Sequence, residues 1–212
     1  MAMSASLWRH ARIGTVMLYL LLATPAARGW MEATMTGHML LQIPLLAVIG
    51  VVLCFLLPER LQELLLATAG GAVPCLLLAS FASGYWMLPR ALDGALTNPM
   101  NEAAKFFSLP LLVGLPLGLA WKRLEIIGRS LVWTNGISML GVLGWLYITA
   151  PVRVCNNYLV EQQEIAGWWM VKLALVLFAC WLCSFFVGGD PAANDPPGAS
   201  SPDGNRSQSK LA

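Results

Sequence analysis

A histidine, two methionines and a glutamine stand at helical spacing just before a long apolar run. They are Met31, Met35, His38 and Gln42, and a helix through this stretch would stack them on one face. Two thioethers and an imidazole form a soft ligand set, which suits Cu(I) better than Mg²⁺, Ca²⁺ or Mn²⁺ because those ions prefer oxygen ligands. The spacing therefore predicts a Cu(I) site formed by His38, Met31 and Met35.

The same residues have a second interpretation. Methionine side chains at helical spacing are a common way to fill a hydrophobic core. On this interpretation they pack inside a helical bundle and bind no metal. Both interpretations stay open at this point.

The composition is that of a membrane protein. Hydrophobic residues make up 58% of the 212 residues, charged residues only 11%, and the mean hydropathy is +0.67. Five apolar runs have about the length needed to cross a hydrocarbon core. We therefore predict an all-α, polytopic helical bundle with five spans, Met39–Leu57, Leu64–Trp86, Ala103–Trp121, Leu131–Ala150 and Ile165–Val187.

A sixth, shorter apolar run lies near the N-terminus. Basic residues precede the run at 13–27, and it ends in Thr24-Pro25-Ala26-Ala27, which is typical of a secretory signal peptide. Residues 1–27 are therefore either a signal peptide, cleaved after Ala26, or a short first transmembrane segment. Residues 28–187 form the bundle, and residues 188–212, rich in Pro, Gly, Ser and Asp, form a disordered cytoplasmic tail.

The basic residues between the runs predict an orientation. Lys and Arg gather on the side that receives the N-terminus, the Lys122-Arg123 loop and the tail, and this excess marks the cytoplasmic side. The other side receives the polar and sulfur-bearing residues whose side chains are best suited to binding or catalysis. These include Met87, Arg90, Asp93, Met100 and Glu102 in the second outer loop, and Cys155, Asn156, Asn157, Tyr158 and residues 161–164 in the third. Lys105 counts only as one of the four basic residues on this side, with Arg28, Arg90 and Arg153.

Local patterns predict how the helices begin, bend and pack. Asn98 followed by Pro99 is a typical helix start. Prolines inside the spans remove backbone donors and bend the helices. Gly167 in the last run, and the pair Gly141 and Gly144 in the run before it, provide small surfaces for close helix contact.

Three stretches resemble the CtaG-type family of integral-membrane cytochrome c oxidase assembly factors. Residues 34–46, with His38-Met39-Leu40-Leu41 and Pro44-Leu45-Leu46, are similar to that family's His-Met-x-x-His-Met-Leu-Leu and Pro-Leu-Leu. Residues 98–106 are similar to its His-Pro-x-x-His-x-x-x-His, and residues 161–170 to its Asp-Gln-Gln-x-x-Ala-Gly-x-x-Met. The order and spacing of the three stretches agree with those of the family's motifs over about 130 residues.

The departures from the family pattern fall on its histidines. Thr34, Asn98, Glu102 and Phe106 stand where histidines would be, and only His38 remains. The resemblance implies an assembly factor linked to copper delivery. It also implies that a copper site in this chain would use His38 with Met31 and Met35, and Met100 or Cys155 as further ligands.

We therefore expect a non-enzymatic accessory factor. It would serve a respiratory haem–copper oxidase from the periplasmic side of a bacterial inner membrane, with Cu(I) as its metal and oxidase subunits as its partners. The alternatives are a metal-free structural or anchoring subunit of a membrane complex and a small transporter. No sequence pattern indicates a nucleophile triad, a phosphate loop or nucleic-acid binding. The client, the oligomeric state and the fate of the leader stay open, and a homo-oligomer is compatible with the sequence.

Overall fold

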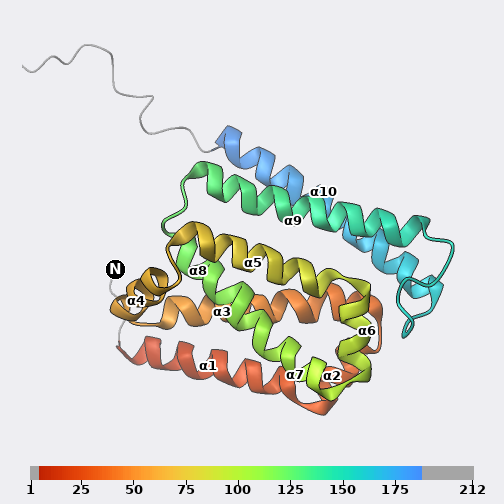
Figure 1. Ribbon diagram of the computed structural model, residues 1–212, viewed down its shortest axis with the longest axis horizontal. Coiled ribbons are helices and arrows are strands. Elements are labelled where there is room, and N and C mark those ends of the chain that lie inside the picture. Colours follow the sequence, from red (N-terminus) through yellow and green to blue (C-terminus); the bar gives the residue numbers. More distant parts are fainter. Residues whose placement is uncertain (1–4, 188–212) are drawn as a thin grey trace, which may run out of the picture.

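The computed structural model describes residues 5–187, and every regular element in that range is helical (Figure 1). The predicted all-α membrane bundle is confirmed. The predicted tail, 188–212, lies outside the described residues. The helices are α1 (Ala5–Ala23), α2 (Pro25–Glu32), the π-helical turn η1 (Gly37–Gln42), α3 (Ile43–Leu56), α4 (Glu59–Thr68), α5 (Ala72–Met87), α6 (Pro89–Thr97), α7 (Pro99–Ser108), the π-helical turn η2 (Leu109–Gly114), α8 (Leu115–Trp121), α9 (Ile126–Thr149) and α10 (Val160–Val187).

Four stretches of the described chain are long and apolar enough to cross a membrane. They are Gly37–Leu56, Pro99–Trp121, Ile126–Thr149 and Val160–Ser184. Each overlaps one of the runs predicted from the sequence. A fifth span is present if α4 and α5 together count as one.

The run predicted as a span over Leu64–Trp86 is divided between two helices. The chain is bent by 79° between α4 and α5. Gly70 and Gly71 occupy the bend with φ values of 84° and 107°, a region that residues with a side chain rarely adopt. The apolar residues on both sides of these glycines make one continuous run in the sequence, and so they concealed the break.

Two of the proline-containing stretches form wide turns. In η1 and η2 the backbone bonds pass from each N–H to the carbonyl five residues earlier: Ile43 N–H donates to the His38 carbonyl, and Leu115 N–H donates to that of Pro110. A proline in or near such a turn cannot supply the N–H that a regular helix needs; Pro110 lies within η2, and Pro44 lies two residues after the end of η1. The prolines thus widen these helices locally as well as bending them.

The central part of the bundle is built around the crossing of α3 and η2. Gly50 lies directly against the Pro110 carbonyl, and Gly114 lies against the Ala47 carbonyl, so a side chain at either glycine would collide with backbone. Helix α1 joins this bundle because Tyr19 Oη donates to the Phe106 carbonyl at 3.2 Å. Cleavage after Ala26 would remove that contact, and cleavage itself stays a prediction.

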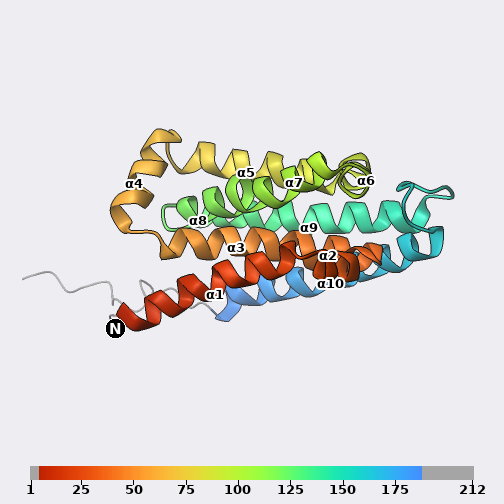
Figure 2. The ribbon, with the colours of Figure 1, turned by 90° about the horizontal axis from the view of Figure 1, so that it is seen from below.

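The bundle has two distinct ends (Figures 1 and 2). The start of α1, helix α4 and the linker 122–125 lie at one end, which we call the α4 end. Helices α2 and α6 and the loop 150–159 lie at the other, which we call the α6 end. This grouping is the one that the predicted topology requires.

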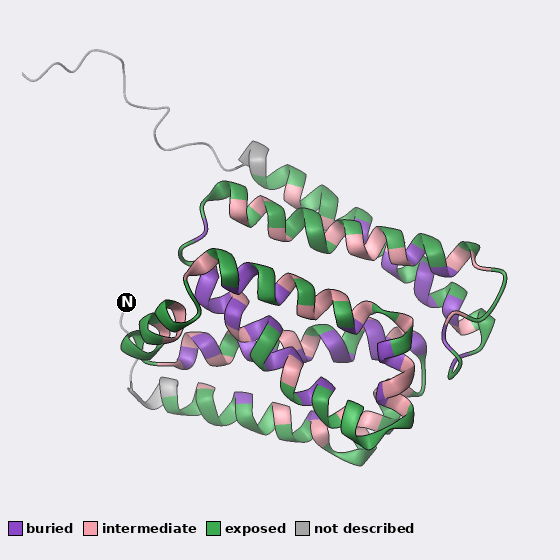
Figure 3. Cartoon of the chain, viewed as in Figure 1, coloured by how far each residue is buried: buried purple, intermediate pink, exposed green. Residues whose placement is uncertain are grey.

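Helices α9 and α10 form a hairpin that is covered less than the two central spans, η1–α3 and α7–α8 (Figure 3). Within the most apolar windows, 44% of the η1–α3 span and 56% of the α7–α8 span are buried, against 11% for α9 and 22% for α10. The hairpin is closed by the predicted glycine contact. An ideal Cβ on Gly167 would lie 2.7 Å from the Gly144 carbonyl oxygen, whereas Gly141 has nothing within 4 Å.

Candidate functional site: a buried polar cluster at the α6 end

Five polar side chains meet at the α6 end, just inside the first turns of two spans. We call them the Lys105 cluster: Glu32 from α2, His38 and Gln42 from η1, Lys105 from α7, and Tyr158 from the loop 150–159. His38, Gln42 and Lys105 are fully buried. A charged group inside a membrane span is costly and is usually either paired or functional.

The Lys105 ammonium is the centre of this cluster. Its Nζ lies 2.7 Å from Glu32 Oε1, 2.9 Å from Gln42 Oε1 and 3.2 Å from His38 Nε2. An ammonium has three N–H donors, and here there is one acceptor for each. The Gln42 amide also donates to Glu32 Oε1 at 2.9 Å, so the carboxylate fixes both partners.

The contacts of Tyr158 assign the proton on the His38 ring. Tyr158 Oη donates its single proton to the Glu32 backbone carbonyl at 3.0 Å, so at His38 Nδ1, 3.1 Å away, it acts as acceptor. Nδ1 therefore carries the ring proton, and Nε2 offers its lone pair to Lys105. One consistent set of donors and acceptors satisfies the cluster.

Two further sets of polar contacts hold the segments that carry the cluster. Asp93 on α6 holds the loop 150–159, since its carboxylate accepts from the backbone N–H of Asn156 at 2.8 Å and from the Asn157 side-chain amide at 3.1 Å. Arg28 on α2 pairs with Glu102 on α7. The cluster is therefore enclosed by three segments that are distant in the sequence.

The loop also buries two ionisable groups outside the spans. Burial, followed by the nearby carboxylate of Glu32, raises the pKa of the Tyr158 hydroxyl. Burial, followed by the negative charge of Asp93, raises the pKa of the Cys155 thiol to about 12. Both groups therefore stay protonated at neutral pH, and Cys155 is a poor nucleophile in this state.

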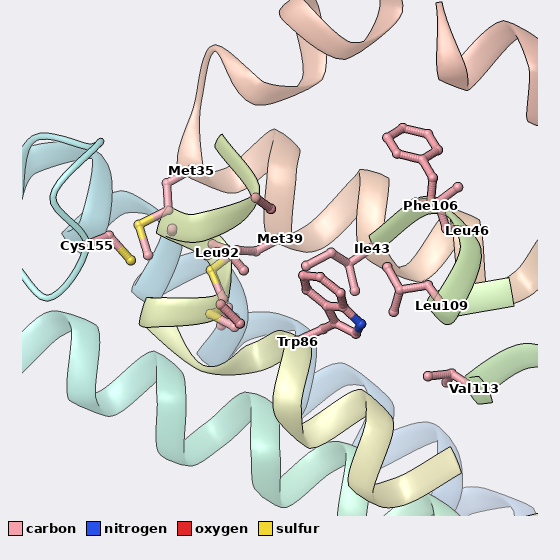
Figure 4. Close-up of a cluster of buried hydrophobic side chains, with 14 of the residues drawn as sticks. Met35, Met39, Ile43, Leu46, Trp86, Leu92, Phe106, Leu109, Val113 and Cys155 are labelled. Atoms are coloured by element: carbon pink, nitrogen blue, oxygen red, sulfur yellow. The ribbon is translucent and has the colours of Figure 1, made fainter. Parts of the chain in front are cut away.

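The shared helical face expected for the predicted metal ligands is not formed. Helix α2 ends at Glu32, a turn follows, and η1 then changes the helical register. Met31 and Met35 pack with the hydrophobic core, and Met35 points toward Cys155 (Figure 4). The imidazole of His38 instead faces Lys105 and Tyr158. Met100, the other implied ligand, is largely exposed on α7.

The geometry gives His38 polar partners, whereas Met31 and Met35 have apolar surroundings. Within the described part of the chain, no three His, Cys, Asp or Glu side chains converge as metal ligands. A cation at His38 Nε2 would also meet the positive charge of Lys105. The Cu(I) site stays a prediction, and forming it at His38 would require Lys105 to move.

Sequence reasoning found His38 and Gln42 but missed the residues that pair with them. Lys105 was counted among the basic residues of an outer loop, although it lies in the second turn of α7. The position of a lysine so close to a predicted span was the sequence signal that could have indicated a buried ion pair. Its partner Glu32 is 73 residues away, and one sequence gives no means of joining them.

Comparison with known proteins gives no match to this chain, whether with protein-family models, with curated proteins or with solved structures.

Proposed function

We propose that this protein is a membrane-embedded accessory factor for the assembly of a respiratory haem–copper oxidase. It acts at the α6 end, which we place on the periplasmic side of a bacterial inner membrane. The observation that carries the proposal is the meeting of His38 with Lys105. These residues come from the first two stretches that resemble the CtaG-type family, and the third stretch begins just after Tyr158, which completes the cluster.

Two forms of this function follow from the sequence, one that delivers copper and one that needs no metal. The resting geometry supports the metal-free form, because both ring nitrogens of His38 have protein partners and one partner is an ammonium. In this form the Lys105 ammonium supplies the positive charge that a metal ion would otherwise bring to the lone pairs of Glu32 and His38. The cluster then fixes α2 and the loop 150–159 as a rigid docking surface.

Removal of the protein from its own cells tests the assembly role. We expect the haem–copper oxidase signal in membrane spectra to fall severalfold and to return when the wild-type gene is restored. Lys105→Met should fail to restore it, whereas Lys172→Met should succeed, because Lys172 lies outside the cluster. An unchanged oxidase level in the deletion cells would refute the proposal.

The anchoring-subunit alternative differs in its stoichiometry. An assembly factor leaves its client, while a subunit stays with the finished complex. The purified oxidase should therefore contain far less than one copy of this protein per complex. A ratio of one to one would favour the subunit.

The side of the membrane is tested by reporter fusions. A fusion at Asp93, on α6, should report the periplasm, and one at Arg123, beyond α8, should report the cytoplasm. Gly198, a third useful position for the predicted tail, lies outside the described residues. Periplasmic activity at Arg123 would reverse the proposed orientation.

A further inference from the structure

The outer face of α9 carries a regular row of exposed side chains. They recur at alternating steps of four and three residues along the helix, and we call them the α9 stripe: Leu131, Asn135, Ser138, Val142 and Trp145. All five are exposed. This spacing is that of the contact seam between two helices that cross at a small left-handed angle.

The other faces of α9 already have partners. On one face Val132 packs with the small core cluster that includes Cys75, and the Met139 methyl group reaches Gly84 of α5. On another face Gly144 and Tyr147 pack against Gly167 of α10. The α9 stripe thus remains as the face without a neighbour among the described residues.

Asn135 makes the exposure of this stripe costly. Its side-chain amide has no hydrogen bond or other recorded partner among the described residues. It lies about 4 Å along the helix axis from the centre of α9, at 1.5 Å per residue, and so near the middle of the bilayer. Hydrocarbon offers no hydrogen-bond partner, so an amide at this depth favours association with another helix.

We propose that the α9 stripe is the interface at which two copies of this chain associate in the membrane. Two copies inserted with the same topology are related by a twofold axis along the membrane normal, so their α9 helices run parallel. Each Asn135 then meets the Asn135 of the other copy at the same depth. A side-chain amide has both N–H donors and a carbonyl acceptor, so the two Asn135 side chains can form hydrogen bonds with each other.

Disulfide cross-linking tests the contact directly. Ser138→Cys is made in a background with Cys180→Ala and Cys183→Ala, which removes the exposed native thiols. Oxidation in membranes should convert Ser138→Cys largely to a dimer. The matched control is Leu175→Cys, at an exposed position of α10, and it should stay monomeric. Equal cross-linking at both positions, or linkage only to another protein, would overturn the proposal.

The second test measures the strength of association in lipid bilayers. Asn135→Leu should weaken dimerisation roughly 3- to 30-fold, the range for an interhelical polar contact in membranes. Asn135→Gln keeps the amide and should retain most of the affinity. Asn101→Leu, at an exposed position of α7, is the matched control and should leave dimerisation unchanged. A monomeric wild-type protein, or a dimer that Asn135→Leu leaves unchanged, would contradict the inference.

Discussion

The Lys105 cluster and the α9 stripe both place polar side chains within the apolar length of the bundle, but they differ in where the partners lie. In the cluster, each hydrogen-bonding group of Lys105 and His38 meets a group of the same chain. On the stripe, the Asn135 amide has no hydrogen-bond partner among residues 5–187. The comparison suggests that the first region stabilises the monomer and that the second is completed only by association.

The difference follows from how the helices are covered. The cluster is enclosed because α2, α7 and the loop 150–159 converge on η1. The α9–α10 hairpin has one tight seam, at Gly144 and Gly167, and only 11% and 22% of the most apolar windows of α9 and α10 are buried. Substitutions in the cluster should therefore change the stability of the fold, while those on the stripe should change the dimer alone.

The largest effect is expected from Lys105→Met. Removing one member of a buried ion pair leaves Glu32 without its counter-charge, and this should cost about 3–5 kcal/mol of folding free energy. Lys172→Met is the matched control, since Lys172 is exposed and its Nζ lies 5.0 Å from the Trp169 ring centroid. It should cost less than about 1 kcal/mol. Unfolding in detergent measures both, and equal losses would remove the distinction between the two lysines.

A smaller effect is expected at the hairpin seam. Gly167→Leu inserts a side chain where a Cβ already lies 2.7 Å from the Gly144 carbonyl oxygen, and the overpacking should cost about 1–3 kcal/mol. Gly141→Leu, on α9, enters open space and should be tolerated. Thermal unfolding of the two variants provides the comparison. If both glycines accept leucine equally, the seam does not hold the hairpin.

The smallest change in stability is expected from Asp93→Ala. It removes the acceptor that holds Asn156 and Asn157, and should cost about 1–2 kcal/mol. The loop should then loosen and expose Cys155.

Maleimide labelling reports that loosening, again with Cys180→Ala and Cys183→Ala. The raised pKa of about 12 keeps the Cys155 thiol protonated, so the wild-type rate should climb with pH through pH 10 without a plateau. After Asp93→Ala the thiol pKa should return toward its ordinary value of about 8.5, and labelling at pH 8 should accelerate at least about tenfold. An unchanged rate would show that Asp93 does not hold the loop.

Local rules of the sequence predicted much of the fold. The Asn98 side chain accepts from Met100 N–H and Pro99 opens α7, as the cap pattern indicates. Gly144 and Gly167 meet as small residues in membrane helices commonly do. The cap depends on neighbouring residues, and each glycine is recognised by its type inside an apolar run, so a single sequence contains that information; which glycine meets which is known only from the structure.

The candidate site could be predicted only in part, because it depends on distant pairings and on a change of helical register. His38 was recognised by its residue type, but the turn after Glu32 and the wide turn η1 separate it from the face that Met31 would share. The Lys105 contacts join segments 63 to 73 residues apart. Hydropathy places such residues near the membrane surface and says nothing of their partners.

The most direct test of the account is a competition titration with a Cu(I) chelator. It compares the wild type, His38→Ala, the Met31→Ala/Met35→Ala double variant and Lys105→Ala. Because the Lys105 ammonium lies where a cation would bind at His38 Nε2, the first three should bind Cu(I) with the same weak affinity. Lys105→Ala frees Nε2 and removes a positive charge. It should therefore bind Cu(I) at least about tenfold more tightly. Tight binding of one Cu(I) by the wild type, lost in His38→Ala, would contradict the account and establish the copper site predicted from the sequence.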